Sequence, residues 1–393
     1  MTSTNDIDRL LGKTLELVHK YIDPRRVADA RRRQADVFNW KPTDYLPLVF
    51  WGSAPELTGL PDFDWRRQFD DPRVSLYVQL KLLIATIAHG ADICPAVRAD
   101  TGVINCPTVL GAPYEVPAHT KPVINGNVGK AALAAFRVPD DISGLGVLPI
   151  MARHARHHLA ALKRAGLAEL VILHHCDLQG PFDIAAQAYG HDEIFLDLYI
   201  DGPFVHELMA KSTDIYVKMA VLCKQLAGQP LRAGHANQYW MDPGSVRVCD
   251  DSGILVSAEK YAEFLVPYIA PALAPFGGGW IHYCGGVPDG NRPEGLHLHD
   301  LYCAVPGMRG LNFTTASGLE GQIEKLMARK VAYLGGLPRE KEAPLAQHFR
   351  HALELCKPHG RRGMIFEAGV RAGEEESAVA LWRKLQDEML PKA

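Results

Sequence analysis

The chain has 393 residues, which is enough for two or three average domains or for one long barrel domain. Its 42 Lys and Arg residues nearly balance 45 Asp and Glu residues, so the formal charge of −3 gives no reason to expect a nucleic-acid partner. Hydrophobic residues at 47% and charged residues at 22% are ordinary for a globular protein and exclude disorder of the whole chain.

Neither a membrane partner nor secretion is indicated. The sequence contains no run of 18 apolar residues, so no transmembrane helix is expected. The polar start, MTSTNDIDRLLGK, lacks the basic and apolar regions of a signal peptide, and we therefore expect a cytoplasmic protein. Eight scattered cysteines without short paired spacing would then be free thiols, available for packing or for binding a metal.

The first segment of the chain is predicted to be helical. An apolar stripe and a basic face recur at helical spacing over residues 1–36, and we place an N-terminal helical extension at residues 1–40. We expect Arg31–Arg33 to lie on a solvated helix face, with a polyanion site as the alternative. The apolar run from Tyr45 to Trp51 follows as the first buried strand.

Apolar runs and helical patterns then alternate to the end of the chain. Further strands are predicted at 93–99, 169–175, 194–201, 246–251, 279–286, 308–313, 330–336 and 363–369. Helices are predicted at 151–166, 204–228, 257–273, 320–330 and 377–390. This alternation, without a dinucleotide or P-loop fingerprint, predicts the α/β class and a (β/α)8 TIM barrel over residues 41–393.

Two details of this barrel need separate predictions. Nine candidate strands are one more than a closed eight-stranded barrel needs, and we expect 93–99 to be the surplus one. The segment 100–145 is rich in Gly, Pro and Asn, and we predict an excursion or hairpin over one end of the barrel.

The sharpest candidate for chemistry is the segment GGGWIHYCGG. His282 and Cys284 are two residues apart at a predicted strand end, so their side chains should share one face. That face points into the mouth of a barrel, and an imidazole nitrogen beside a thiolate suits zinc. The alternative is a His and a Cys that only pack at a strand end.

Two other strand ends carry candidate residues. In VILHHCDLQGP, His174 and Cys176 should share one face and His175 and Asp177 the other, so that they form a substrate-facing wall. The alternative is polar residues satisfied by nearby backbone groups. Trp51, at the end of the first strand, is expected to line the same cavity, although an aromatic residue at this point could equally belong to the core.

Carboxylates and a further thiol could complete the site. Cys249, Asp250 and Asp251 fall where a strand meets a loop, and we expect Asp250 to cap structure and Asp251 to act in the site. Glu367, at the end of the last strand, could also reach the mouth. Asp251 and Glu367 are therefore the candidate catalytic carboxylates, and Cys249 is a candidate metal ligand.

The order of several motifs resembles a known superfamily. These motifs are Asp44 and Pro47, GPFDIA (180–185), DDSGILVSAEKYAEFLVPY (250–268) and IHYCGG (281–286). Together they resemble the uroporphyrinogen decarboxylase-like superfamily, and within it the methylcobamide:coenzyme M and related corrinoid-linked methyltransferases. The resemblance implies a (β/α)8 barrel with its site at the mouth, and zinc bound by His282 and Cys284.

The sequence departs from two patterns within this superfamily. Its decarboxylases carry an arginine-bearing loop after the first strand, but GSAPEL (52–57) stands here, so binding of an octacarboxylate tetrapyrrole is not expected. In its zinc methyltransferases a later cysteine completes the metal site, and Val370 stands where that cysteine would fall. Glu367, Asp251 or Cys249 could replace it as a ligand.

The hypothesis that follows is a zinc-dependent methyl- or alkyl-transferase. It would act on a small molecule. The methyl group would move between a donor, which is either a corrinoid carried by a partner protein or a small molecule, and a thiol-type acceptor. One alternative is a metal-free lyase or decarboxylase with Asp251 and His282 as acid and base. Another is a barrel that binds a corrinoid or tetrapyrrole without catalysis.

Overall fold

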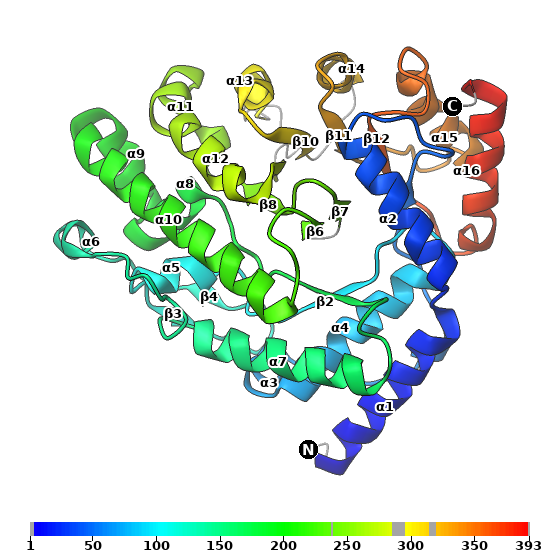
Figure 1. Ribbon diagram of the computed structural model, residues 1–393, viewed down its shortest axis with the longest axis horizontal. Coiled ribbons are helices and arrows are strands. Elements are labelled where there is room, and N and C mark those ends of the chain that lie inside the picture. The colour runs from blue at the N-terminus through cyan, green and yellow to red at the C-terminus, as the bar shows by residue number, and fades with distance from the viewer. Residues whose placement is uncertain (1–3, 237–238, 285–294, 314–319, 392–393) are drawn as a thin grey trace.

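The fold is built on parallel β-strands. The computed structural model describes residues 4–236, 239–284, 295–313 and 320–391. Six strands form one parallel sheet in the order β1 (Leu48–Val49), β12 (Met364–Glu367), β11 (Ala332–Gly335), β10 (Met308–Phe313), β9 (Gly279–Tyr283) and β8 (Val246–Cys249). Two more, β2 (Ala96–Arg98) and β5 (Ile172–His174), pair in parallel with each other. The α/β class predicted from the sequence is confirmed, and Figure 1 shows helices around the outside of the strands.

Single backbone hydrogen bonds connect the two parallel sheets at both places where they meet. The amide of Asp92, just before β2, donates to the carbonyl of Leu48 in β1 at 2.8 Å. The amide of Cys249 in β8 donates to the carbonyl of Gln179, after β5, at 3.3 Å. Within the described ranges, the hydrogen-bonded ladders themselves do not run through all eight strands.

The structure changes the assignment of two predicted strands. The segment 93–99 contains β2, which pairs with β5, so our expectation that it is the surplus strand was wrong. The segment 194–201 lies instead in helix α9 (His191–Ile200). Short apolar runs fit either periodicity, and Asp192 and Glu193 in the first helical turn favour the helix because they complement its dipole.

Long helices follow most strands, as the alternation predicted. The N-terminal extension contains α1 (Thr4–Tyr21) and α2 (Pro24–Phe38), and the helices near the first strands are η1 (Pro55–Leu57), α3 (Trp65–Asp70), α4 (Pro72–Ile87) and α7 (Leu148–Arg164). In the middle of the chain lie α8 (Pro181–Tyr189), α10 (Gly202–Ala227), η2 (Gly253–Leu255), α11 (Ala258–Phe264), α12 (Val266–Leu273) and η3 (Ala274–Phe276). Toward the C-terminus follow η4 (Leu296–Leu298), α13 (His299–Ala304), α14 (Glu320–Ala328), α15 (Leu345–Cys356) and α16 (Glu375–Met389).

An ion-pair network fastens α2 to the first strand region. Arg33 is buried, in contrast to the solvated position expected for Arg31–Arg33. Its guanidinium donates to Asp44 at 2.7 Å and to the buried Asp92 at 2.6 Å. Asp92 in turn accepts the amide of Leu48. Asp44, one of the motif residues, therefore has a structural partner in α2.

The segment 100–145 is an excursion with its own small elements. It contains α5 (Asn105–Val109), the antiparallel pair β3 (Tyr114–Glu115) and β4 (Val123–Ile124), and α6 (Lys130–Ala135). Figure 1 shows these elements on the same side of the molecule as α7 and α9.

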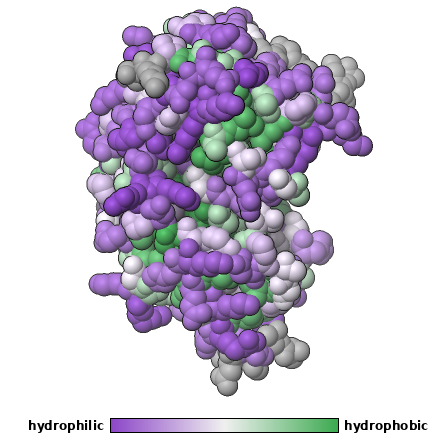
Figure 2. Space-filling model, turned by 90° about the vertical axis from the view of Figure 1, so that its right-hand side faces the viewer, coloured by the Kyte–Doolittle hydropathy of each residue, from purple (hydrophilic) through white to green (hydrophobic). Residues whose placement is uncertain are grey.

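A short antiparallel pair that the sequence did not reveal fills the space among the strands. Strands β6 (Gly234–Ala236) and β7 (Tyr239–Met241) lie within the ring of elements in Figure 1. Tyr239 and Met241 share a buried cluster with Trp280 of β9 and with side chains of β1, β11 and β12. The face seen in Figure 2 is mostly hydrophilic, with smaller apolar areas. Among the described residues, no helix combines the length and apolar character needed to cross a membrane.

Candidate functional site

Residues of three types that bind metals, Cys, Asp and His, lie together where β8 and β9 end. The two strands are parallel neighbours with Cys249 in register with His282. The Cys249 thiol, a carboxylate oxygen of Asp251 and a ring nitrogen of His282 all lie within 4.8 Å of one another. Cys284 Sγ is 3.1 Å from His282 Nε2, in agreement with the shared face expected from their spacing. Gly285 and Gly286 of the motif lie outside the described residues.

The loop after β8 is held in place by the GPFDIA segment. Asp183, in the first turn of α8, accepts the amides of Asp251 at 3.0 Å and Ser252 at 2.7 Å. A Cβ atom at Gly180 would collide with the carbonyl oxygen of Cys249, so the segment can approach β8 only with glycine at this position. The motif therefore positions the donor cluster.

Asp251 links the two strand ends directly. One carboxylate oxygen accepts the amide of Cys284 at 2.5 Å, and the other lies 3.1 Å from Cys249 Sγ. The side chain is thus fixed between the Cys249 thiol and the Cys284 backbone, where it can serve as a metal ligand or as a proton acceptor.

A residue that sequence reasoning missed orients the histidine. His282 Nδ1 lies 2.5 Å from the amide oxygen of Asn312, which stands in register with it on β10. The Asn312 side-chain nitrogen donates to the carbonyl of Leu334, so the amide oxygen faces the ring. Nδ1 therefore carries the proton, and Nε2 is left to act as a ligand. The signal in the sequence was an amide at the end of a predicted strand.

Burial favours the neutral forms of the two thiols and of the imidazole. Burial raises the pKa of the Cys249 thiol well above its usual value, and burial together with Asp251 raises the pKa of Cys284 to about 11. Burial, and then the positive charge of Arg247, lower the pKa of His282. A bound divalent cation would reverse these effects on the thiols, because thiolates are its ligands. Two sulfurs, one imidazole nitrogen and one carboxylate fit the ligand preferences of zinc.

Neither Glu367, at the end of the last strand, nor the position of Val370 beyond it joins this cluster. Glu367 accepts a hydrogen bond from the Tyr239 hydroxyl of the β6–β7 pair. In the described part of the chain it is not a member of the group of close metal-type donors. Val370, where a cysteine ligand was expected from the family pattern, is a partly buried residue of the main hydrophobic core.

The residues after β5 are arranged differently from the prediction. The strand ends at His174, so the alternation does not continue to Cys176 and Asp177. Cys176 is buried with its sulfur 3.7 Å from that of Cys223, whereas His174 and Asp177 line an open pocket of about 680 Å³ together with Trp51. Our prediction that His174 and Cys176 share one face was therefore wrong.

Asp250 has the structural role expected for it. It is buried, and one of its oxygens accepts hydrogen bonds from Tyr261 at 2.5 Å and Tyr302 at 2.7 Å. Burial raises the pKa of Asp250 to about 7. Tyr261 is part of the 250–268 motif, so this motif fastens α11 to the end of β8.

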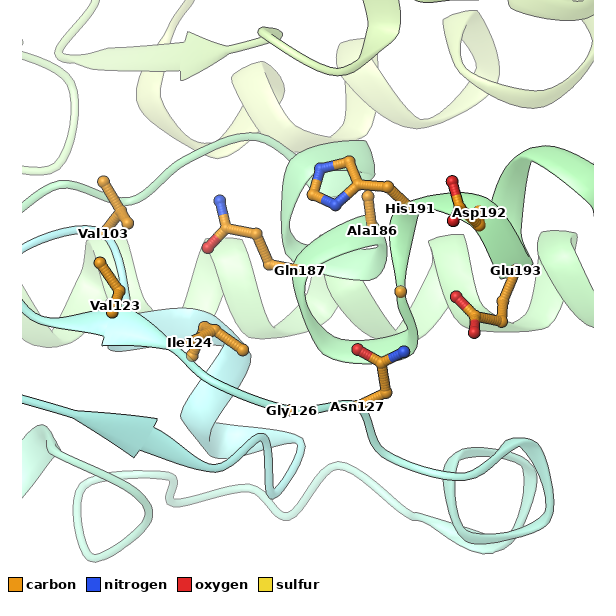
Figure 3. A pocket seen from close by; sticks show the side chains of 11 residues that line it. Val103, Val123, Ile124, Gly126, Asn127, Ala186, Gln187, His191, Asp192 and Glu193 are labelled. Carbon is orange, nitrogen blue, oxygen red and sulfur yellow. The ribbon is translucent and has the colours of Figure 1, made fainter.

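A second pocket, of about 460 Å³, lies between the excursion and the α8–α9 junction. Figure 3 shows Gln187 and His191 on one side, with Val123 and Ile124 opposite. Gln187 donates to Gln179 at 2.9 Å. Gln179 in turn donates to Asp177 at 2.9 Å, so a chain of hydrogen bonds joins this pocket to the first.

Comparison with known proteins identifies the fold but not a family. No family model matches the chain, and no curated protein matches it in sequence. Among solved structures, the fold is similar to that of a methyltransferase from Methanosarcina mazei, with a TM-score of 0.63 and 15% sequence identity. The match covers 91% of this chain and 98% of that chain. The superfamily resemblance drawn from the motifs stays a prediction.

Proposed function

We propose that the protein is a zinc-dependent methyltransferase that moves a methyl group from a corrinoid or small donor to a thiol-type acceptor. The observation that carries the proposal is the convergence of Cys249, Asp251 and His282 within 4.8 Å at the ends of two neighbouring parallel strands. Cys284 Sγ lies 3.1 Å from the Nε2 atom of this histidine. The motif resemblance and the similarity in fold to a methyltransferase support it. A corrinoid-carrying protein is the proposed partner.

The proposal includes a closed eight-stranded barrel. Eight parallel strands, with backbone hydrogen bonds between the two sheets at both meeting points, support closure. The donors lie at the carboxyl ends of β8 and β9. Active sites of such barrels occupy this end, where loops from several strands converge.

A zinc ion held by these residues would bind the acceptor sulfur and lower its pKa, so that a thiolate is available near neutral pH. The chain prepares this chemistry with an oriented imidazole, because Asn312 fixes which ring nitrogen of His282 is free. Asp251, which lies 3.1 Å from the Cys249 sulfur and accepts the amide of Cys284, would receive the acceptor's proton. The carbon–sulfur bond then forms while the bond from carbon to the donor breaks, and the donor retains that electron pair.

Metal content tests the site directly. Protein purified without added metal should contain about one zinc per chain by elemental analysis, since the two thiols and the imidazole would hold the ion and leave a fourth position for the acceptor sulfur beside Asp251. Cys284→Ala should lose most of this zinc. Cys303→Ala is the matched control, because Cys303 is a partly exposed thiol on α13 outside the cluster, and its zinc content should equal that of the wild type.

Turnover tests the reaction. Wild-type protein with methylcobalamin and a panel of small thiols should form a methyl thioether, detected by mass spectrometry, and Cys284→Ala should not. Zinc content that is unchanged in Cys284→Ala, or equal thioether formation by wild type and Cys284→Ala, would contradict the proposal.

A further inference from the structure

The pocket lined by His174, Asp177 and Trp51 has a polar floor and an apolar rim. Its floor comes from the ends of β2 and β5 and from β8, through Arg98, His174 and Arg247. Its rim includes Trp51, after β1, and Trp65, on α3. The volume of about 680 Å³ is typical of a small-molecule site.

The two guanidinium groups on the floor are largely buried, with side-chain exposures of 15% for Arg98 and 10% for Arg247. Arg247 Nη2 donates to Asp177 at 2.6 Å, and Arg98 Nη2 donates to Asp100 at 2.9 Å. Arg98 Nη1 is 3.9 Å from Asp177. Between them the two arginines share two carboxylates.

Both arginines keep donors for a ligand. In the described part of the chain, no hydrogen bond engages Nε or Nη1 of either Arg98 or Arg247. Neither residue is among those with fully buried unpartnered nitrogens, so these N–H groups reach the pocket. Partly buried guanidinium groups with spare donors suit the two oxygens of a carboxylate.

The formal charges of the side chains that line the pocket sum to one positive charge. Arg98, Arg247 and Lys121 contribute three positive charges, and Asp100 and Asp177 contribute two negative ones. His174 stays neutral, because burial lowers its pKa well below the usual value. A ligand with one negative charge would balance the site, whereas a doubly charged phosphate would exceed it.

The rim exposes unusually large apolar side chains. Trp51 is 53% exposed and Leu82 is 59% exposed, and both line the pocket beside Val78 and Trp65. Exposed aromatic and aliphatic groups around a concave polar floor indicate that an apolar group covers them.

We propose that this pocket binds a monocarboxylate with a flat apolar or aromatic body, the carboxylate on Arg98 and Arg247 and the body against Trp51. Arg247 and Cys249 point to the same side of β8, so the bound molecule lies next to the donor cluster. As a substrate class the inference rests on the proposed methyl transfer, but the binding itself can be measured without turnover.

Isothermal titration of the full-length protein with 4-methoxybenzoate and its neutral analogue 4-methoxybenzamide tests the inference. The acid should bind at least tenfold more tightly than the amide, because only the acid forms charge-assisted hydrogen bonds with the arginines. Arg98→Gln should remove this preference and leave the amide affinity unchanged. Trp51→Ala should weaken both ligands by a similar factor. Tyr199→Ala, an exposed residue of α9 outside the pocket, is the control and should change neither.

Several results would overturn the inference. They are equal affinity for acid and amide, no saturation by the acid at about 10 mM, or an acid preference that survives in folded Arg98→Gln. If Arg98→Gln does not fold, the ratio of acid to amide affinity in the wild type decides. The titration is repeated with Cys284→Ala. If this variant has lost zinc and still binds the acid, the result supports the pocket independently of the metal. If the wild type contains no zinc but binds the acid normally, only the proposed function is contradicted.

Discussion

The carboxylate of Asp183 should be one of the most important single groups for the geometry of the donor cluster. It is 1% exposed, and its two oxygens accept the amides of Asp251 and Ser252. Asp183→Ala leaves both amides without their acceptor, at about 1–3 kcal/mol for each. Part of this loss is offset. Burial and the nearby carboxylates of Asp251 and Asp250 raise the pKa of Asp183, so the buried group itself lowers the free energy of unfolding. We therefore expect a net loss of about 2–3 kcal/mol.

Asp183→Asn refines this test. The asparagine oxygen can accept one of the two amides without a buried charge, so the expected loss is smaller, about 1 kcal/mol. Asp140→Ala, an exposed residue of the excursion, is the control and should stay within about 0.5 kcal/mol of the wild type.

Urea unfolding followed by far-UV circular dichroism measures the three variants against the wild type. Zinc content, measured in parallel, should fall in Asp183→Ala because Asp251 loses its anchored backbone. The reasoning is refuted if Asp183→Ala unfolds within 0.5 kcal/mol of the wild type, or if Asp183→Asn is the less stable of the two.

Three further predictions follow from buried polar groups. Asn312→Leu should weaken zinc affinity by about 10–100-fold in chelator competition, since it removes the partner that orients His282; unchanged affinity would exclude this role. The raised pKa of Asp250 means that the folded state holds a proton which the unfolded state releases. The free energy of unfolding should therefore fall as pH rises from about 4 to about 7, by at most about 4 kcal/mol. In Asp250→Asn the urea midpoint should depend less on pH over this range, and the same pH dependence as in the wild type would contradict the reasoning. Arg33→Met should cost about 3–5 kcal/mol in urea unfolding because Asp92 stays buried without its partner, and a loss below 1 kcal/mol would contradict this.

The centre of the site could be predicted because it depends on local geometry. His282 and Cys284 are two residues apart at a strand end, and the alternation of a strand suffices to bring them together. Cys249 and Asp251 were recognised because they fall where a predicted strand meets a loop. Asn312 and Asp183 could not be assigned their roles, since each contacts the site through strand register or a helix start that is distant in sequence.

Strand alternation gave a wrong prediction where the strand ended earlier than expected. Alternation predicted one face for His174 and Cys176, but β5 ends at His174 and the chain turns, so that Cys176 enters the core. The segment 194–201 was misassigned because its apolar residues are dense enough to fit a strand. The acidic first turn and the burial of Ile194 and Leu198 favour the helix. Glu367 lies at a strand end as predicted, yet the unpredicted β6–β7 pair places Tyr239 against it.

Strand β8 connects the two halves of the proposed mechanism. Arg247 and Cys249 are two residues apart on it, which corresponds to a rise of about 7 Å along the strand. A carboxylate held by Arg247 would therefore place the rest of a small ligand within reach of the sulfur and nitrogen donors, without any movement of the backbone. The arginine also disfavours protonation of His282, so the charge that would hold the ligand keeps the imidazole free to bind a metal. Because the arginines would contact the proposed ligand and the cysteines the proposed metal, the two functions should be separable, and a variant that lacks one should retain the other.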